Sequence, residues 1–127
     1  LAFGAPLRIG PGVEAIAGLD LRRCREGSYD FRITGKGLFM ATRYSAGEQR
    51  DWIVSTTSHP AIRTPMTGSN RLAVTAKGDR VRVFLNGQLA ASFRDTTLRR
   101  GTMGLSAFCG EEPAAVTFSD LTLFEPG

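Results

Sequence analysis

The sequence has few of the residues on which many active sites depend. Among 127 residues there are one histidine, two cysteines and one tryptophan, and the only lysines among 16 basic residues are Lys36 and Lys77. Zinc sites built from several Cys and His ligands are therefore excluded. No apolar run approaches the roughly 18 residues of a membrane-spanning helix, so membrane insertion is not expected. The chain is also too short for a second full domain.

What is present indicates one folded domain over residues 1–127. Hydrophobic residues make up 42% of the chain, and the formal charge is only +4, so a packed core is expected rather than disorder. Residues 1–14 are rich in glycine and proline and predict an irregular lead-in. Because the chain begins with Leu1 rather than methionine, we expect it to be a fragment of a larger protein.

Hydrophobic and polar residues alternate through most of the chain, as in half-buried β-strands. Turn signals separate these stretches, and Asn86-Gly87 is the strongest of them because a type I′ turn needs two positive φ angles. No long segment shows a helical stripe. The pattern predicts about nine strands near residues 15–23, 28–34, 37–44, 50–56, 70–77, 80–86, 88–94, 102–108 and 114–124.

Several motifs occur in an informative order. The strand NRLAVTAKGD (residues 70–79) precedes VRVFLNGQL (81–89), and GTMGLSA (101–107) precedes VTFSDLTL (116–123); GLDLR (18–22) and SYDFRI (28–33) come earlier. This series resembles concanavalin A-like, or laminin-G-like, jelly-roll domains. It is most similar to a bacterial extracellular family related to 3-keto-disaccharide hydrolases. The resemblance covers roughly residues 15–124.

The resemblance implies an all-β, concanavalin A-like antiparallel β-sandwich (jelly roll). Such domains have further strands before the "GLDLR" strand, so the opening strands are either absent here or supplied by a partner chain or a homodimer. Phe118 is expected to be followed by a bulge or bend near Ser119 and Asp120. The residues expected to fill the core are Val74, Val83, Leu85, Phe93, Leu105, Phe118 and Leu123.

The residues give no catalytic set. His59 stands in a hydroxyl-rich loop without a Gly-x-Ser-x-Gly motif, and we interpret it as an exposed loop residue. Glu111 and Glu112 are adjacent, so on a strand they would face opposite ways and could not cooperate. The chain also lacks the Glu-x-Asp-x-Glu run of related glucanases, which argues against a hydrolase.

No metal or cofactor is expected from the residues. Laminin-G-like domains often bind calcium, but Asp51, Asp79, Asp95 and Asp120 are scattered, and calcium wants six or more oxygen ligands. Cys24 and Cys109 allow two interpretations. They are either two small buried residues or one disulfide of a secreted protein.

The best ligand-binding candidates lie where two strands meet at a short connection. Arg43 and Tyr44 end one strand, and Arg50 and Trp52 begin the next. Trp52 is first interpreted as a core residue, because tryptophan buries a large area. If it is exposed, these four residues make a plausible carbohydrate-binding face. The remaining arginines lie among acids and favour a solvated surface over nucleic-acid binding.

We therefore expect a non-catalytic binding or sensor module of a larger bacterial protein, extracellular or at the cell surface. Its partner would be a glycan or another cell-surface polymer. Two alternatives remain open: a glycoside-acting hydrolase, which needs converging carboxylates, and an assembly domain that pairs through an exposed sheet edge.

Overall fold

The computed structural model describes residues 2–9, 16–45, 49–63, 69–98, 101–108, 116–118 and 122–124. These residues form eleven antiparallel strands and no helix. The strands are β1 (Ala2–Ile9), β2 (Ile16–Cys24), β3 (Gly27–Thr34), β4 (Leu38–Ser45), β5 (Gln49–Ser58), β6 (Ser69–Lys77), β7 (Arg80–Leu85), β8 (Gln88–Arg94), β9 (Thr102–Phe108), β10 (Val116–Phe118) and β11 (Thr122–Phe124). Within the described ranges, no helix is long and apolar enough to cross a membrane.

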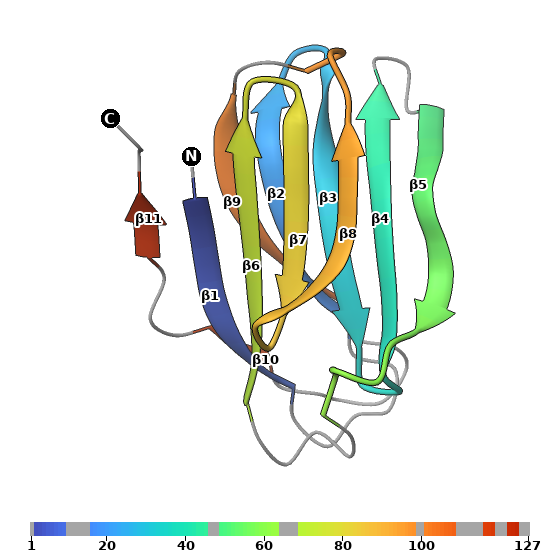
Figure 1. Cartoon of the computed structure of the whole chain (residues 1–127), viewed down its shortest axis with the longest axis vertical. Helices are drawn as coiled ribbons and strands as arrows, with labels where there is room; N and C mark the ends of the chain where they lie inside the picture. The colour runs from blue at the N-terminus through green and yellow to red at the C-terminus, as the bar shows by residue number, and fades with distance from the viewer. Residues whose placement is uncertain are drawn as a thin grey trace.

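The strands form two sheets that pack face to face (Figure 1). Sheet A has the order β10-β1-β6-β7-β8, with β11 also paired to β1, and sheet B has the order β5-β4-β3-β2-β9. The predicted sandwich is confirmed, and the predicted strands are found with two differences, one at each end of the chain. The segment expected as one strand over 114–124 forms the two short strands β10 and β11. The bulge expected near Ser119 and Asp120 lies outside the described residues.

The expectation of an irregular lead-in over residues 1–14 is wrong for its first part. Ala2–Ile9 forms β1, which pairs with β6 on one side and with β10 and β11 on the other. The opening strand is thus present in this chain. The residue pattern does not predict this strand, because Gly4 and Pro6 are residue types that are depleted in strands.

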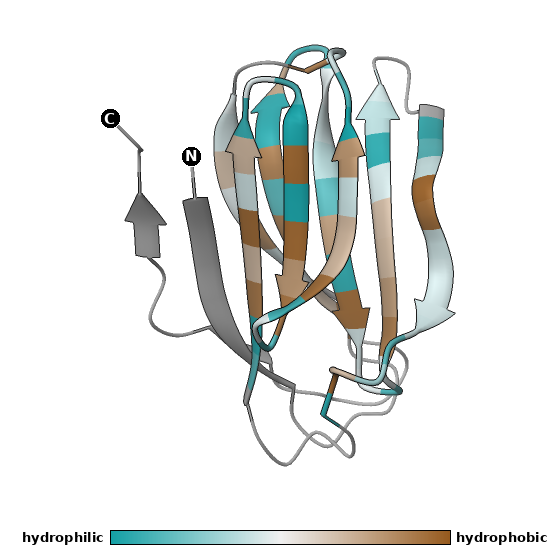
Figure 2. Ribbon diagram, viewed as in Figure 1, coloured by the Kyte–Doolittle hydropathy of each residue, from teal (hydrophilic) through white to brown (hydrophobic). Residues whose placement is uncertain are grey.

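The core lies between the sheets and follows the predicted alternation. Figure 2 shows hydrophilic and hydrophobic bands alternating along β7. Val74 and Val83 are opposite each other across β6 and β7, and both are fully buried, as is Leu85. Phe93 is partly buried, and its ring centroid lies 6.1 Å from that of Tyr29 and 6.2 Å from that of Phe31.

One core prediction is wrong, and two are untested. Leu105 is 38% exposed, because it lies on β9 at the edge of sheet B. The side chains of Phe118 and Leu123 lie outside the described residues. The Asn86-Gly87 turn is confirmed: both residues have positive φ, 50° and 82°. The Asn86 side chain also donates to Ala61 O at 2.7 Å and so ties the turn to the loop after β5.

Candidate functional site

The outer face of sheet B, which points away from the core, carries a cross-strand row of residues that is polar at its centre. Cross-strand partners point to the same side of a sheet. The pairings Gly104↔Asp20, Asp20↔Asp30, Asp30↔Thr42 and Thr42↔Trp52 therefore set one residue from each of β9, β2, β3, β4 and β5 side by side. In the next row, Ser28, Tyr44 and Arg50 are paired in the same way.

Two carboxyl groups at the centre of this face are buried. Asp20 is 5% exposed and Asp30 is 2% exposed. Ser28 Oγ donates to Asp30 Oδ1 at 3.0 Å, and Arg32 Nη2 lies 3.8 Å from Asp30 Oδ2. Arg23 Nη2 lies 3.3 Å from Asp20 Oδ2. Two arginines thus compensate two acids within one cluster, which a buried ionic group requires.

Asp20 holds its proton far more tightly than an ordinary aspartic acid. Burial, a hydrogen bond with Asp30 and the negative charge of Asp30 together raise the pKa of Asp20 from 3.8 to about 7. The charges of Arg23 and Arg32 oppose this rise without cancelling it. At neutral pH the Asp20 carboxyl is therefore partly protonated.

A β-bulge in β2 directs Arg23 toward this cluster. The pairing of β2 with both neighbours shifts between Asp20 and Cys24, and Arg22 takes the left-handed conformation, with φ 53°. Arg22 is thereby buried, and its Nη1 donates to Leu98 O at 3.0 Å. Because the extra residue reverses the alternation, the next residue, Arg23, joins Asp20 on the outer face.

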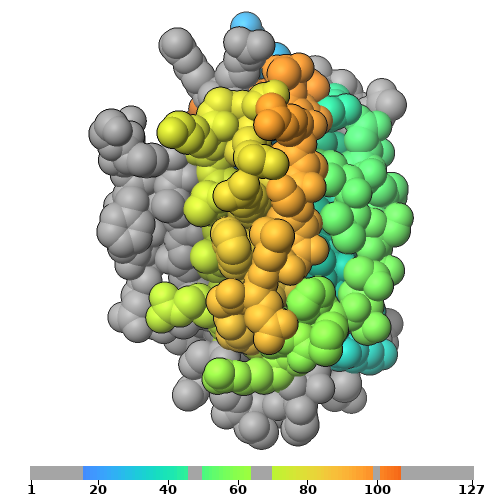
Figure 3. Space-filling model, viewed as in Figure 1, coloured from blue at the N-terminus to red at the C-terminus, as the bar shows by residue number. Residues whose placement is uncertain are grey.

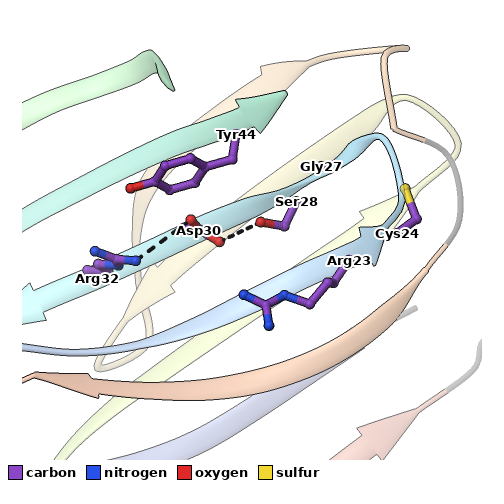
Figure 4. Close-up of a pocket in the computed structure, with 7 residues that line it drawn as sticks. All are labelled: Arg23, Cys24, Gly27, Ser28, Asp30, Arg32 and Tyr44. Carbon is purple, nitrogen blue, oxygen red and sulfur yellow. Dashed lines mark hydrogen bonds and ion pairs between the residues drawn. The ribbon is translucent and has the colours of Figure 1, made fainter. Parts of the chain in front are cut away.

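A cavity of about 510 Å³ opens beside the acid pair. Figure 4 shows Asp30 between Ser28 and Arg32, with Tyr44 of β4 on one side and Arg23 of β2 on the other. Gly27 has φ +144° and closes the wall, where a Cβ would lie 1.8 Å from Tyr44 O, so only glycine fits. Cys24 also lines the cavity, and a hydrogen bond from its side chain helps lower the pKa of Glu26.

Three of the four predicted ligand-binding residues form a rim next to this cavity. The guanidinium carbon of Arg50 lies 4.8 Å from the ring centroid of Tyr44 and 5.5 Å from that of Trp52. Arg50 also donates to the Tyr44 hydroxyl. Trp52 is 48% exposed, so its first interpretation as a core residue is wrong. It faces outward because it pairs with outward-facing Thr42 at the edge strand β5.

Arg43, the fourth predicted residue, points to the other side of sheet B. Its Nη2 lies 2.8 Å from Asp51 Oδ2, and its Nη1 donates to Asp95, which follows β8. The Tyr29 hydroxyl also donates to Asp95, at 2.6 Å. Burial favours the neutral acid, but hydrogen bonds from Tyr29 and Thr97 and the Arg43 charge outweigh it and lower the pKa of Asp95. This network joins the two sheets.

The strand pattern does not single out the acid pair. Asp20 and Asp30 stand at polar positions of β2 and β3, and such positions in a half-buried strand are ordinarily solvated. A signal was available: the two acids stand nearly equidistant from the Arg25-Glu26 turn. In a hairpin, such positions face each other across the strands. Their burial depends on the covering arginines and Tyr44, which the strand pattern does not predict.

The remaining predictions can be placed in part. His59 is half-buried rather than exposed, and its Nδ1 accepts a hydrogen bond from Ala61 N at 3.1 Å. Cys24 forms no disulfide within the described residues. Cys109, Glu111 and Glu112 lie outside those residues, so the Cys24–Cys109 disulfide stays a prediction. No group of three His, Cys, Asp or Glu in the described ranges could hold a metal ion. Calcium remains untested.

Comparison with solved structures identifies the fold. A carbohydrate-binding module, CBM66 from Bacillus subtilis, superposes with a TM-score of 0.76 at 19% identity, over 94% of this chain and 71% of that one. Sheep galectin-11, solved with glycerol, gives 0.66 at 9% identity, over 95% and 86%. A Bacillus licheniformis β-glucanase gives 0.63 at 9% identity, over 94% and 63%.

All three are concanavalin A-like sandwiches, so the expected jelly-roll fold is confirmed. No protein-family model matches the sequence. No curated protein matches it either. The resemblance to proteins related to 3-keto-disaccharide hydrolases therefore stays a prediction.

Proposed function

We propose that this chain is a non-catalytic carbohydrate-binding module that holds a glycan on the outer face of sheet B. One observation carries the proposal: the exposed ring of Trp52 lies in the same cross-strand row as the buried acids Asp20 and Asp30. An exposed aromatic ring and fixed charged hydrogen-bonding groups are thereby combined on one surface.

This combination matches the chemistry of a sugar. A sugar ring presents C–H groups on one face, which stack on an aromatic ring, and hydroxyl groups around its edge. Carboxylates and guanidinium groups accept and donate strong, directional hydrogen bonds to such hydroxyls. Because Asp30 is held by Ser28 and Arg32, its carboxylate is already oriented before a ligand arrives.

The structural neighbours support the same proposal. Two proteins that share this fold are named as a carbohydrate-binding module and as a galectin. A third neighbour is a glucanase, so the fold alone does not choose between binding and hydrolysis. The choice has to come from the residues of this chain.

The acid pair favours binding over hydrolysis. Glycosidases separate their two carboxyl groups by about 5–5.5 Å or about 6.5–9.5 Å, so that a sugar carbon or a water fits between them. Asp20 and Asp30 are instead direct cross-strand partners on β2 and β3, and both are buried, so they do not stand on opposite sides of an open space that could hold a glycosidic bond. An assembly role through an edge strand has no comparable observation in its favour.

We further propose that the module works outside the cell or at the cell surface, as a binding or sensor part of a larger bacterial protein. In that location, a glycan-binding module would have access to polymeric glycans. The mature protein's location, followed with an antibody in fractionated cells, tests this part on its own.

A glycan-array screen, followed by calorimetry on any sugar bound, tests the binding site. The matched pair of variants is Trp52→Ala on sheet B and Leu89→Ala on sheet A, since Leu89 is also an exposed large apolar residue. We expect Trp52→Ala to weaken binding by about tenfold or more and Leu89→Ala to leave it unchanged. Binding to no glycan, or equal losses in both variants, would overturn the proposal. Release of reducing ends from the bound glycan would favour the hydrolase.

A further inference from the structure

The outer face of strands β6, β7 and β8 in sheet A carries charge of one sign. Strands β6, β7 and β8 contain five basic residues and no Asp or Glu. All five basic side chains are exposed. They are Arg71, Lys77, Arg80, Arg82 and Arg94. We call this surface the basic face.

The basic face follows directly from strand alternation. Leu72, Ala76, Val81 and Val83 point into the core, so their neighbours along the strands point outward. In Figure 3 the side chains of β6, β7 and β8 lie side by side on the surface turned toward the viewer. The interpretation that the arginines lie among acids is therefore wrong for this face.

Three of the cations form one cross-strand row, in which the middle residue is opposite each of the other two. Lys77 pairs with Arg80, and Arg80 pairs with Arg94, across β6, β7 and β8. Like charges in direct cross-strand contact destabilise a sheet. Of the five cations, only Arg94 has an acid within ion-pair distance among the described residues, Asp79 Oδ1 at 3.7 Å. The row thus concentrates positive charge at a cost to the fold.

We infer that the basic face binds an acidic polysaccharide, a polymer that carries carboxylate or sulfate groups along its length. Neighbouring strands are spaced by about 4.8 Å, so the row offers cationic groups at short, regular intervals. Guanidinium groups bind carboxylate and sulfate through paired hydrogen bonds. Arg82, one position further along the same face, extends the surface in the strand direction.

The other large polyanions fit this face less well. Proteins that bind single-stranded nucleic acid on a sheet stack bases on exposed aromatic rings. In the described part of β6–β8, Phe84 is the only aromatic residue at an outward position, and it is half-buried. Binding at a membrane surface needs several apolar side chains to enter the lipid, and Leu89 is the only exposed large apolar side chain described on these strands.

This site is separate from the one proposed on sheet B. The two outer faces lie on opposite sides of the sandwich, with the core between them (Figure 1). Failure of either proposal therefore leaves the other intact, and the variants for each serve as controls for the other.

Binding to polygalacturonate, measured by calorimetry at several salt concentrations, tests the inference. Neutral dextran, duplex DNA and anionic lipid vesicles are the comparison ligands. The test variant is Arg80→Gln/Arg82→Gln, and the control is Arg25→Gln/Lys36→Gln, which removes the same charge from exposed positions in two hairpin turns of sheet B. All four positions are solvent-exposed, and circular dichroism verifies that both variants are folded.

We expect the test variant to bind polygalacturonate about tenfold more weakly and with a shallower salt dependence. The control variant and Trp52→Ala should retain the affinity. Equal losses in test and control variants would show a general charge effect and overturn the proposal. Tighter binding to DNA or to vesicles than to polygalacturonate, or no binding to polygalacturonate, would overturn it as well.

Discussion

The outer faces of the two sheets are both polar, but they hold their charges in opposite ways. On sheet B, Asp20 and Asp30 are buried and compensated by Arg23 and Arg32 within one cluster. On sheet A, the basic residues are exposed, and three of them stand in a row of like charge. The same alternating pattern of strand residues therefore produces two different surfaces.

The difference teaches what each face can recognise. Buried, mutually oriented groups lose little further freedom when a ligand binds, so they suit a discrete ligand of fixed shape. Exposed cations act over a longer range and are screened by salt, so they suit a polymer that neutralises many charges. A short hydrogen-bonded cluster and an extended charged row would thus share one sandwich.

The largest expected effect concerns the Arg43 network, which joins the two sheets. Arg43→Gln removes the ion pairs with Asp51 and Asp95 and should lower the free energy of unfolding by about 1–3 kcal/mol. Arg43 belongs to neither outer face, so both binding affinities should persist under conditions where the variant is folded. Urea unfolding and calorimetry measure the two quantities.

Arg25→Gln is the control for this variant, because Arg25 is exposed and makes no ion pair or hydrogen bond with the residues that the structure describes, so the unfolding midpoint should stay unchanged. If Arg43→Gln abolished glycan binding at unchanged stability, the prediction that Arg43 contacts the ligand would be right. The ligand site would then have to extend from the outer face of sheet B to the side on which Arg43 lies.

A smaller effect is expected in the pH dependence of the free energy of unfolding, which the acid pair of sheet B causes and the basic face of sheet A does not. The pKa of Asp20 is raised from 3.8 to about 7 in the folded state by burial and by Asp30, so the folded protein holds this proton more tightly than the unfolded chain. The stabilisation is complete below about pH 4 and is lost as pH rises through 7, by about 1–2 kcal/mol after solvent screening is allowed for. Urea midpoints measured from pH 4 to pH 8 should fall accordingly.

Asp20→Asn should flatten this pH profile, while Asp79→Asn, in the β6–β7 turn of sheet A, should leave it in place. The groups that face Asp20 are Arg23 on its own strand and Asp30 and Arg32 on β3. The lowered pKa of Asp95 acts at lower pH and in the opposite direction, outside this window. A flat profile in the unaltered protein would mean that Asp20 ionises normally and that the acid pair is not coupled.

Strand periodicity predicted most of the fold because one side of each strand is apolar. The β6 and β7 strands show this well: Val74 and Val83 were assigned to the core and are fully buried. Strand periodicity does not reveal β1, where the composition opposes the structure. In β1, Gly4 and Pro6 disfavour a strand, yet pairing with β6 on one side and with β10 and β11 on the other incorporates the segment. Such long-range pairing cannot be derived from local sequence.

The candidate site was predictable only at its rim. Tyr44, Arg50 and Trp52 were grouped because they flank one short connection, and they do lie together. Arg43 was grouped with them by sequence proximity, but adjacent strand residues point to opposite faces. The position of Arg23 depends on the bulge at Arg22, and no residue type in that stretch marks a bulge.

The smallest expected effect tests whether the basic face is kept at a cost to the fold. Arg80→Gln removes the central charge of the row Lys77–Arg80–Arg94 and should raise the free energy of unfolding by about 0.2–1 kcal/mol. Urea unfolding at low salt measures the gain, which 1 M NaCl should abolish through screening. Arg50→Gln on sheet B should give no such gain, because it loses contacts with Tyr44 and Trp52. A loss of stability in Arg80→Gln would mean that the row stabilises the fold. The charged groups of both faces would then support folding, and the faces would differ only in how exposed those groups are.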